Sequence, residues 1–216
     1  YLADGTAISF TDNAWQDTNS TLRTGEGILL WSNNTAGAVS AGSMIVLDVA
    51  AKTSSVGVCS GTSPNLAADG DQILAFQGLS ASPFFIAALN MDGSTPWLSG
   101  AQTANSSALP AGLTNGVNCL GLLEIDNAIY DMSTTSGTKA ELLAAIHTSA
   151  NWTGDNATAY PMPPSGAFAV AGGATPAYVP GYSNRTVSGT SQSVTGLTTG
   201  ATYSFRARAV SPGGTG

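Results

Sequence analysis

The side chains of this chain that are best suited to chemistry are carboxylates, which fall into two groups. One group is Glu124, Asp126 and Asp131, and the other is Asp69, Asp71 and Asp92. Paired carboxylates can hydrolyse glycosides, and carboxylates joined by backbone carbonyls can bind calcium. An Asp beside Gly or Asn is also typical of a turn, and we favour turns over catalysis here. Asp69, Asp71 and Asp92 remain candidate calcium ligands, without an EF-hand or repeat calcium motif.

The sequence indicates neither a catalytic residue nor a cofactor. His147 is the sole histidine and follows a predicted helix, where a cation meets the negative end of the helix dipole. No Ser or Cys nucleophile motif accompanies it. We expect the protein not to be an enzyme, and we expect Arg23 and Glu26 to form an internal ion pair with Glu124.

The aromatic and sulfur-containing residues suggest two further kinds of site. Trp15 and Trp97 lie in polar stretches and are candidates for stacking on a sugar, whereas other tryptophans sit beside predicted strands or the helix. Cys59 and Cys119 are too far apart in sequence for the paired spacing of a zinc site. A disulfide between them is the favoured interpretation, and two buried free thiols are the alternative.

Composition limits the possible partners. Only 9% of the residues are charged, the net charge is -7 and the isoelectric point is about 4.2. Six scattered basic residues cannot form a nucleic-acid footprint, and no run approaches the roughly 20 apolar residues of a membrane span. A polar surface with few charges suits a protein packed against copies of itself outside the cell or at its surface. The start at Tyr1, without a signal-peptide pattern, suggests a processed form.

The elements that position these residues are predominantly short apolar runs bounded by turn residues, which predict strands. The centre of the fold is expected at Asp71–Met91, a hairpin of two such runs joined by Leu-Ser-Ala-Ser-Pro. The other strands expected in the first part of the chain are Ala7–Phe10, Gly27–Trp31, Met44–Val49, Ser55–Cys59, Cys119–Ile125 and Ala128–Tyr130.

One helix is predicted, from Lys139 to His147. Thr138 and Glu141 have the spacing of a capping box, and Leu142, Leu143 and Ile146 share one face. The sequence therefore predicts an all-β fold with one short helix.

A change in composition between Tyr160 and Gly173 indicates a domain boundary, giving a β-sandwich module over 1–160 and a second domain over 161–216. Strands are expected in the second domain at Tyr178–Tyr182, Ser191–Leu197 and Thr202–Val210. The last of these alternates apolar and polar residues, which is typical of a half-buried strand.

The segment from Ser191 to Val210, with Gly196-Leu-Thr-Thr-Gly followed by Tyr203, resembles the later strands of a fibronectin type III domain. The resemblance covers about residues 175 to 216 and implies an incomplete Ig-like sandwich. The expected early strands that carry tryptophan are not recognisable.

The first part resembles a β-rich module of large secreted and surface-anchored bacterial proteins. The similar motifs are Ile8-Ser-Phe-Thr-Asp-Asn-Ala-Trp, Arg23-Thr-Gly-Glu-Gly, Gly70-Asp-Gln-Ile-Leu-Ala-Phe-Gln-Gly and Asn105-Ser-Ser-Ala-Leu-Pro-Ala-Gly-Leu. The resemblance implies no particular chemistry, but it implies a further strand before Tyr1.

These observations predict an extracellular structural subunit that assembles with its own copies into a fibre, sheath or surface layer. Strands donated between copies would complete the sheets. The alternative is an adhesive or carbohydrate-binding module of a larger secreted protein, with a glycan as partner, and a secreted hydrolase is the third possibility.

Overall fold

The computed structural model describes residues 1–93, 95–100, 102–161, 168–171, 179, 181–182, 185–200, 203, 205, 210–211 and 214–215. The chain divides into two compact units, Tyr1–Thr175 and Pro176–Gly216. The boundary lies 15 residues after the predicted one, because β14 (Ala169–Val170) pairs with β12 (Ser136–Gly137) of the first unit.

The structure confirms the all-β class with one short helix in the described part of the chain. The other strands of the first unit are β1 (Ala7–Thr11), β2 (Trp15–Gln16), β3 (Thr21–Leu22), β4 (Ile28–Ser32), β5 (Leu47–Asp48), β6 (Thr53–Ser54), β7 (Val58–Gly61), β8 (Gln72–Leu79), β9 (Ser82–Asn90), β10 (Leu120–Gly121), β11 (Asn127–Tyr130) and β13 (Trp152–Asp155). No helix among the described residues is long and apolar enough to cross a membrane.

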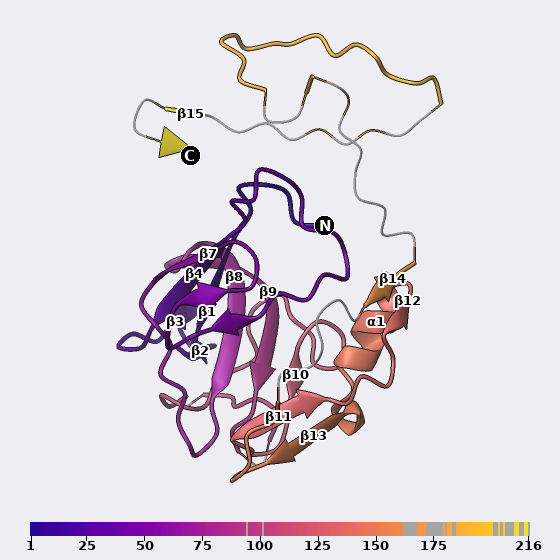
Figure 1. Cartoon of the computed structure of the whole chain (residues 1–216). Helices are drawn as coiled ribbons and strands as arrows, with labels where there is room; N and C mark the ends of the chain where they lie inside the picture. Colours follow the sequence, from indigo (N-terminus) through magenta and orange to yellow (C-terminus); the bar gives the residue numbers. More distant parts are fainter. Residues whose placement is uncertain are drawn as a thin grey trace. The chain divides into compact units, whose positions relative to one another are not determined.

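A six-stranded sheet in the order β10-β9-β8-β1-β4-β7 forms the body of the first unit (Figure 1). The β8–β9 hairpin is central, as predicted, and its irregularity at Ala75/Phe76 accommodates one unmatched residue. Neighbouring strands pair antiparallel except β10, which runs parallel to β9. Four two-stranded pairs (β2–β3, β5–β6, β11–β13 and β12–β14) supplement this sheet in the described part of the first unit.

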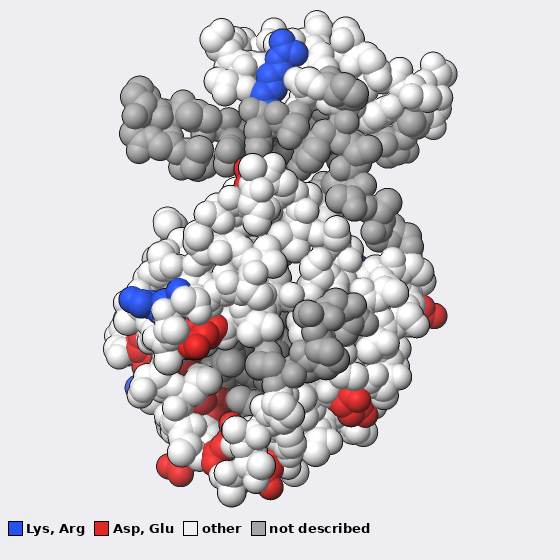
Figure 2. Space-filling view, in the orientation of Figure 1, with Lys and Arg blue, Asp and Glu red and all other residues white. Residues whose placement is uncertain are grey.

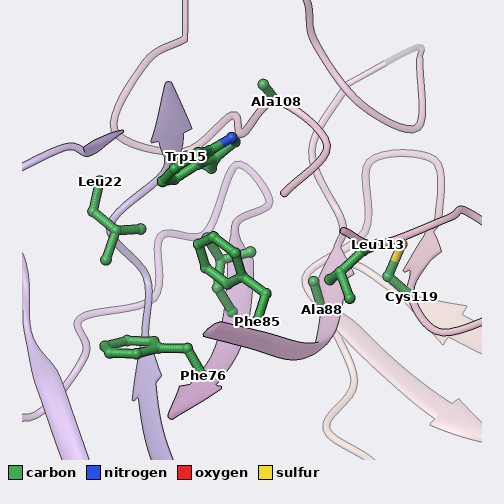
Figure 3. Close-up of a cluster of buried hydrophobic side chains, with 9 residues drawn as sticks. Trp15, Leu22, Phe76, Phe85, Ala88, Ala108, Leu113 and Cys119 are labelled. Atoms are coloured by element: carbon green, nitrogen blue, oxygen red, sulfur yellow. The ribbon is translucent and has the colours of Figure 1, made fainter. Parts of the chain in front are cut away.

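Apolar side chains cover both faces of the sheet, which gives the unit its sandwich character. One face carries a cluster of buried residues comprising Trp15, Leu22, Leu74, Phe76, Phe85, Ala88, Ala108, Leu113 and Cys119 (Figure 3). The β2–β3 pair and the segment between β9 and β10 supply the opposing side chains. Phe85 packs edge-on against Trp15, with ring centroids 5.0 Å apart.

The opposite face has a second cluster around Ile8, Trp31 and Ala75. Leu47, in β5, and Ile45, which precedes β5, pack against it. The Trp31 indole N–H donates to Val56 O (2.7 Å), so this large buried side chain is satisfied as well as packed.

The helix α1 (Lys139–Ile146) begins where the capping box predicts. The Thr138 side chain accepts from Glu141 N (3.3 Å), and the Glu141 carboxylate accepts from Thr138 N (2.8 Å). Leu142 is its buried residue, and a 3-10 turn, η1 (Ser149–Asn151), leads from the helix into β13.

The second unit differs from the prediction. Ser191–Leu197 is not a strand, and the described strands are β15 (Val210–Ser211) and β16 (Gly214–Thr215), which pair with each other. Tyr178–Tyr182 and Thr202–Val210 lie partly outside the described residues. Two tyrosines organise the described stretch: the Tyr182 hydroxyl accepts from Thr195 N (3.1 Å), and the Tyr203 hydroxyl accepts from Thr198 N (2.8 Å).

Candidate functional site

Strand pairing brings five acidic residues to one end of the six-stranded sheet. Asp12 follows β1, Glu26 precedes β4, Asp71 precedes β8, Asp92 follows β9, and Glu124 follows β10. The registers Thr11↔Ile28, Gln72↔Asn90 and Gly121↔Asn90 show that these termini lie at the same end. We call these five residues the acidic end.

The two most buried carboxylates of the acidic end are held by backbone N–H groups. Asp12 is 0% exposed, and its Oδ2 accepts from Asn65 N (2.5 Å). Asp71 is 2% exposed, and its two oxygens accept from Ala67 N (2.8 Å) and Gln72 N (2.7 Å). These bonds fix both side chains but supply no positive charge.

Burial and the repulsion between neighbouring carboxylates raise the pKa values of Glu26, Asp71 and Asp92. Burial, followed by the charges of Asp12 and Asp71, raises the pKa of Glu26 to about 7. Burial, with the charges of Asp12 and Asp92, raises the pKa of Asp71 to about 6 against the effect of its two backbone hydrogen bonds. The pKa of Asp92 is raised by burial and then by Glu124 and Asp69.

The predicted ion pair of Arg23 with Glu26 and Glu124 does not form. The Arg23 guanidinium donates to Gln102 O (3.1 Å), and Glu124 accepts from Asn156 Nδ2 (3.0 Å). The charge of Arg23 lowers the pKa of Glu26, but it is the weakest of the four effects on that group. The acidic end is therefore only weakly compensated by this guanidinium.

Several buried oxygens of this region have no hydrogen-bond partner among the described residues. They are Asp12 Oδ1, Glu26 Oε2, Gln72 Oε1 and Asn90 Oδ1. Buried polar atoms in proteins nearly always have a hydrogen-bond partner, so four buried oxygens without a donor in one region are unusual.

The predicted calcium ligands Asp69, Asp71 and Asp92 flank this end of the sheet but do not form a compact ligand set. Asp69 is exposed, and both oxygens of Asp71 already accept backbone N–H groups. In the described ranges, no three His, Cys, Asp or Glu side chains are arranged to hold a metal ion.

The prediction that Trp15 stacks on a ligand is wrong, because this side chain is 6% exposed and belongs to the core. The residues next to Trp15 in sequence are polar, so the sequence did not indicate that the segment between β9 and β10 packs over this side chain. Trp97 packs against the same cluster and donates its indole N–H to Asn115 Oδ1 (2.9 Å). The two rings therefore serve the core rather than a shared binding platform.

The predicted disulfide is also wrong, since Cys59 and Cys119 are both free. The two side chains belong to clusters on opposite faces of the sheet. Cys119 is fully buried, and burial raises the pKa of its thiol to about 11. This thiol is therefore neutral and packs as a small apolar side chain.

His147 occupies the C-cap of α1, at the predicted position. Burial lowers its pKa, which disfavours the predicted cationic form. It lines a hollow of about 210 Å³ with Phe10, Ile73, Ala87, Leu89, Ile146 and Trp152, among others. A second hollow, of about 240 Å³, is lined by Leu122–Ile125, Ala128, Ser149 and Trp152–Gly154. Both are smaller than the 300–1,000 Å³ typical of small-molecule sites.

No family model matches this chain, and no curated protein or solved structure matches it either. The acidic end is thus characterised by its own geometry. The sequence placed Asp71 and Asp92 in one group of carboxylates and Glu124 in another. Asp12 was not predicted as a site residue, because its neighbours come from strands distant in sequence.

Proposed function

We propose that this chain is an extracellular structural module that associates with copies of itself by adding a strand to the outer side of β7. The observation that carries the proposal is that β7 ends the six-stranded sheet, with β4 as its sheet neighbour on one side and no strand on the other among the described residues. Such an edge is a template for another chain.

The register of β7 defines which backbone groups face outward. Thr62 N donates to Ile28 O (2.9 Å), which continues the β4–β7 ladder. Antiparallel ladders alternate, so Ser60 and Val58 direct their backbone groups toward β4, while Cys59 and Gly61 direct theirs away. The Lys52 ammonium lies 3.4 Å from Gly61 O, which leaves Cys59 able to donate and accept a bond from an incoming strand.

The distribution of charge favours contact between unlike units of neighbouring copies. All 13 acidic residues precede residue 156, whereas Arg185, Arg206 and Arg208 follow residue 176. The first unit, with three basic residues, has a net charge of -10, and the second unit has +3. Opposite charges guide a head-to-tail contact, and a head-to-tail contact that does not close forms a filament.

The character of the surface supports assembly over ligand binding. Figure 2 shows a face dominated by residues that are neither acidic nor basic, with scattered acidic side chains. Exposed apolar side chains among the described residues include Leu79 at 76%, Phe84 at 71% and Phe205 at 67%. The alternative, a carbohydrate-binding module, depended on Trp15, which belongs to the core, and on Trp97, which is partly buried against it.

The test replaces Cys59 by proline. Cys59→Pro removes an outward N–H group that β4 does not use, and proline is tolerated at such edge positions. We expect the variant to remain folded and to lose self-association, measured by sedimentation velocity and electron microscopy over a wide concentration range. The matched control is Ser60→Pro, which removes an N–H group that faces β4 and so destabilises the sheet itself.

Two outcomes would overturn the proposal. One is a wild-type protein that remains monomeric at high concentration and low ionic strength, where charge attraction is strongest. The other is a folded Cys59→Pro variant that assembles as readily as the wild type, since β7 would then not be the contact.

A further inference from the structure

The hollow of about 240 Å³ beside β13 has the size of a side-chain pocket. It lies between the segment that follows β10 and the β11–β13 pair, and it is lined by Leu122–Ile125, Ala128, Ser149 and Trp152–Gly154. This volume is below the 300–1,000 Å³ of most small-molecule sites, but a protein cavity of about 150 Å³ can hold benzene. The hollow can therefore take one long side chain.

Strand register places the apolar walls of the hollow on one side of the β11–β13 pair. Ala128 pairs with Gly154, two residues after Trp152, so the Ala128 and Trp152 side chains point to the same face. The Ile125 side chain lies on this face too, because a Cβ at Gly154 would overlap Ile125 Cδ1. The Trp152 indole N–H donates to Ile146 O (2.7 Å), which fixes the ring in this wall.

Glu124 adds a carboxylate that is exposed and held in place. Asn156 Nδ2 donates to both of its oxygens (3.2 and 3.0 Å), and Asn156 Oδ1 accepts from Asp126 N (3.2 Å). The Glu124 N–H donates to Gly93 O (3.2 Å). Because a carboxylate has about four acceptor positions, about two remain, and a guanidinium fork uses two.

The charge around the hollow favours a cation. The described part of the chain gives Glu124 no Lys or Arg partner. Burial, and after it the charge of Glu124, raises the pKa of Asp92, so a second carboxylate lies nearby. The first unit has a net charge of -10, which attracts cations. Apolar walls with a carboxylate beside them match a basic side chain, which has a hydrocarbon stem and a charged head.

We propose that this hollow, which we call the Trp152 hollow, binds an arginine side chain from the second unit of another copy. The identity of the occupant rests on the proposed self-association. The second unit contains Arg185, Arg206 and Arg208 and no acidic residue. Arg185 is exposed, and its guanidinium lies 5.1 Å from the ring centroid of Tyr182. Arg is favoured over Lys because its planar guanidinium donates two parallel bonds to one carboxylate.

The first test measures ligand binding to the full chain by NMR, with the Trp152 indole N–H as the reporter. N-acetyl-arginine amide is compared at pH 7.5 with its neutral isostere, N-acetyl-citrulline amide. We expect the arginine derivative to bind at least about fivefold more tightly, which is the upper end for an exposed charge pair. Glu124→Gln should remove this preference, because its amide still accepts from Asn156 but has no charge. Asp48→Asn, at an exposed position outside the hollow, is the matched control and should keep the preference.

The second test identifies the occupant through self-association, measured by sedimentation velocity. Glu124→Gln should weaken self-association at least about fivefold, whereas Asp48→Asn, which changes the net charge equally, should not. Changing all three arginines of the second unit to Gln should weaken it at least as much. Adding Glu124→Gln to that variant should have no further effect, because both changes remove the same contact.

The outcomes distinguish this proposal from the contact at β7. Cys59→Pro blocks the β7 edge but leaves the Trp152 hollow intact, so this variant should still prefer the arginine derivative. The hollow is not an arginine site if both derivatives bind the wild type equally, or if Glu124→Gln keeps the preference. The assigned occupant is wrong if Glu124→Gln self-associates as the wild type does, even where Cys59→Pro abolishes assembly.

Discussion

At the scale of single residues, Glu26 and Asp71 titrate near neutral pH. Burial raises their pKa values to about 7 and about 6, against 4.5 and 3.8 for the free side chains. At a pH between the pKa of the free side chain and the raised pKa of the folded state, the folded protein binds more protons than the unfolded chain. The free energy of unfolding therefore falls as the pH rises through this range.

We therefore expect the Tm of the protein to be higher at pH 5 than at pH 8, with most of the loss between pH 5 and pH 7. Glu26→Gln should flatten this dependence, because the neutral amide has no proton to lose. Thermal unfolding in matched buffers measures the effect. Stability that increases with pH over this range would contradict the assignment.

Glu141 is the control for the titration, because its shift has the opposite sign. Hydrogen bonds from the backbone and side chain of Thr138 lower the pKa of Glu141. Its contribution is therefore present above pH 4.5 and is lost only in more acid solution. Glu141→Gln should lower the Tm without changing its slope between pH 5 and pH 7.

At the scale of elements, the start of β4 depends on a close crossing of chains. Segment 63–65 passes directly over Gly27, and its Asn65 N–H reaches Asp12 Oδ2. A Cβ at Gly27 would overlap Ser63 O, which is a backbone atom and cannot rotate away. The absence of a side chain at Gly27 thus allows the segment to close the acidic end.

We expect Gly27→Ala to destabilise the protein by about 1 to 3 kcal/mol, as overpacking does in other cores. The matched control is Gly37→Ala, because a Cβ at Gly37 meets nothing within 4 Å. That variant should lie within about 0.5 kcal/mol of the wild type. Denaturant unfolding measures both, and equal stability of the two variants would refute the role of the crossing.

At the scale of the whole molecule, the described residues of the two units differ in burial. The first unit has apolar clusters on both faces of its sheet. In the second unit Val187, Leu197 and Phe205 are 45%, 44% and 67% exposed. Residues 185–200 form neither strand nor helix, so local opening there costs little free energy.

Trypsin should therefore cleave after Arg185 at least about tenfold faster than after Lys139, since exposed segments without regular structure are the preferred sites of proteolysis. Both side chains are exposed, but Lys139 begins α1. Mass spectrometry of a time course should show a fragment of residues 1–185 that persists. Earlier cleavage at Lys139 would contradict this difference between the units.

The sequence by itself determined the elements that depend on local interactions. The β8–β9 hairpin was predictable because two apolar runs flank a short polar link, and α1 because the capping box and the helical spacing are set within one short segment. Short-range patterns also located β1 and β4, although β10 is much shorter than the predicted strand Cys119–Ile125.

Only the tertiary structure decided where the individual side chains lie. Trp15 is surrounded by polar residues in sequence. Its backbone N–H donates to Ser107 Oγ and its carbonyl accepts from Ala108 N, so a segment about 90 residues away holds it in the core. The sequence favoured a disulfide between Cys59 and Cys119, but the sheet places their side chains on opposite faces.

The acidic end is the clearest case of a site that the sequence could not reveal. Asp12 and Gln72 are 60 residues apart, and an ordinary turn or strand accounts for each of them alone. They meet because β1 and β8 pair side by side in the sheet. Long-range strand pairing, rather than spacing along the chain, therefore created the acidic end.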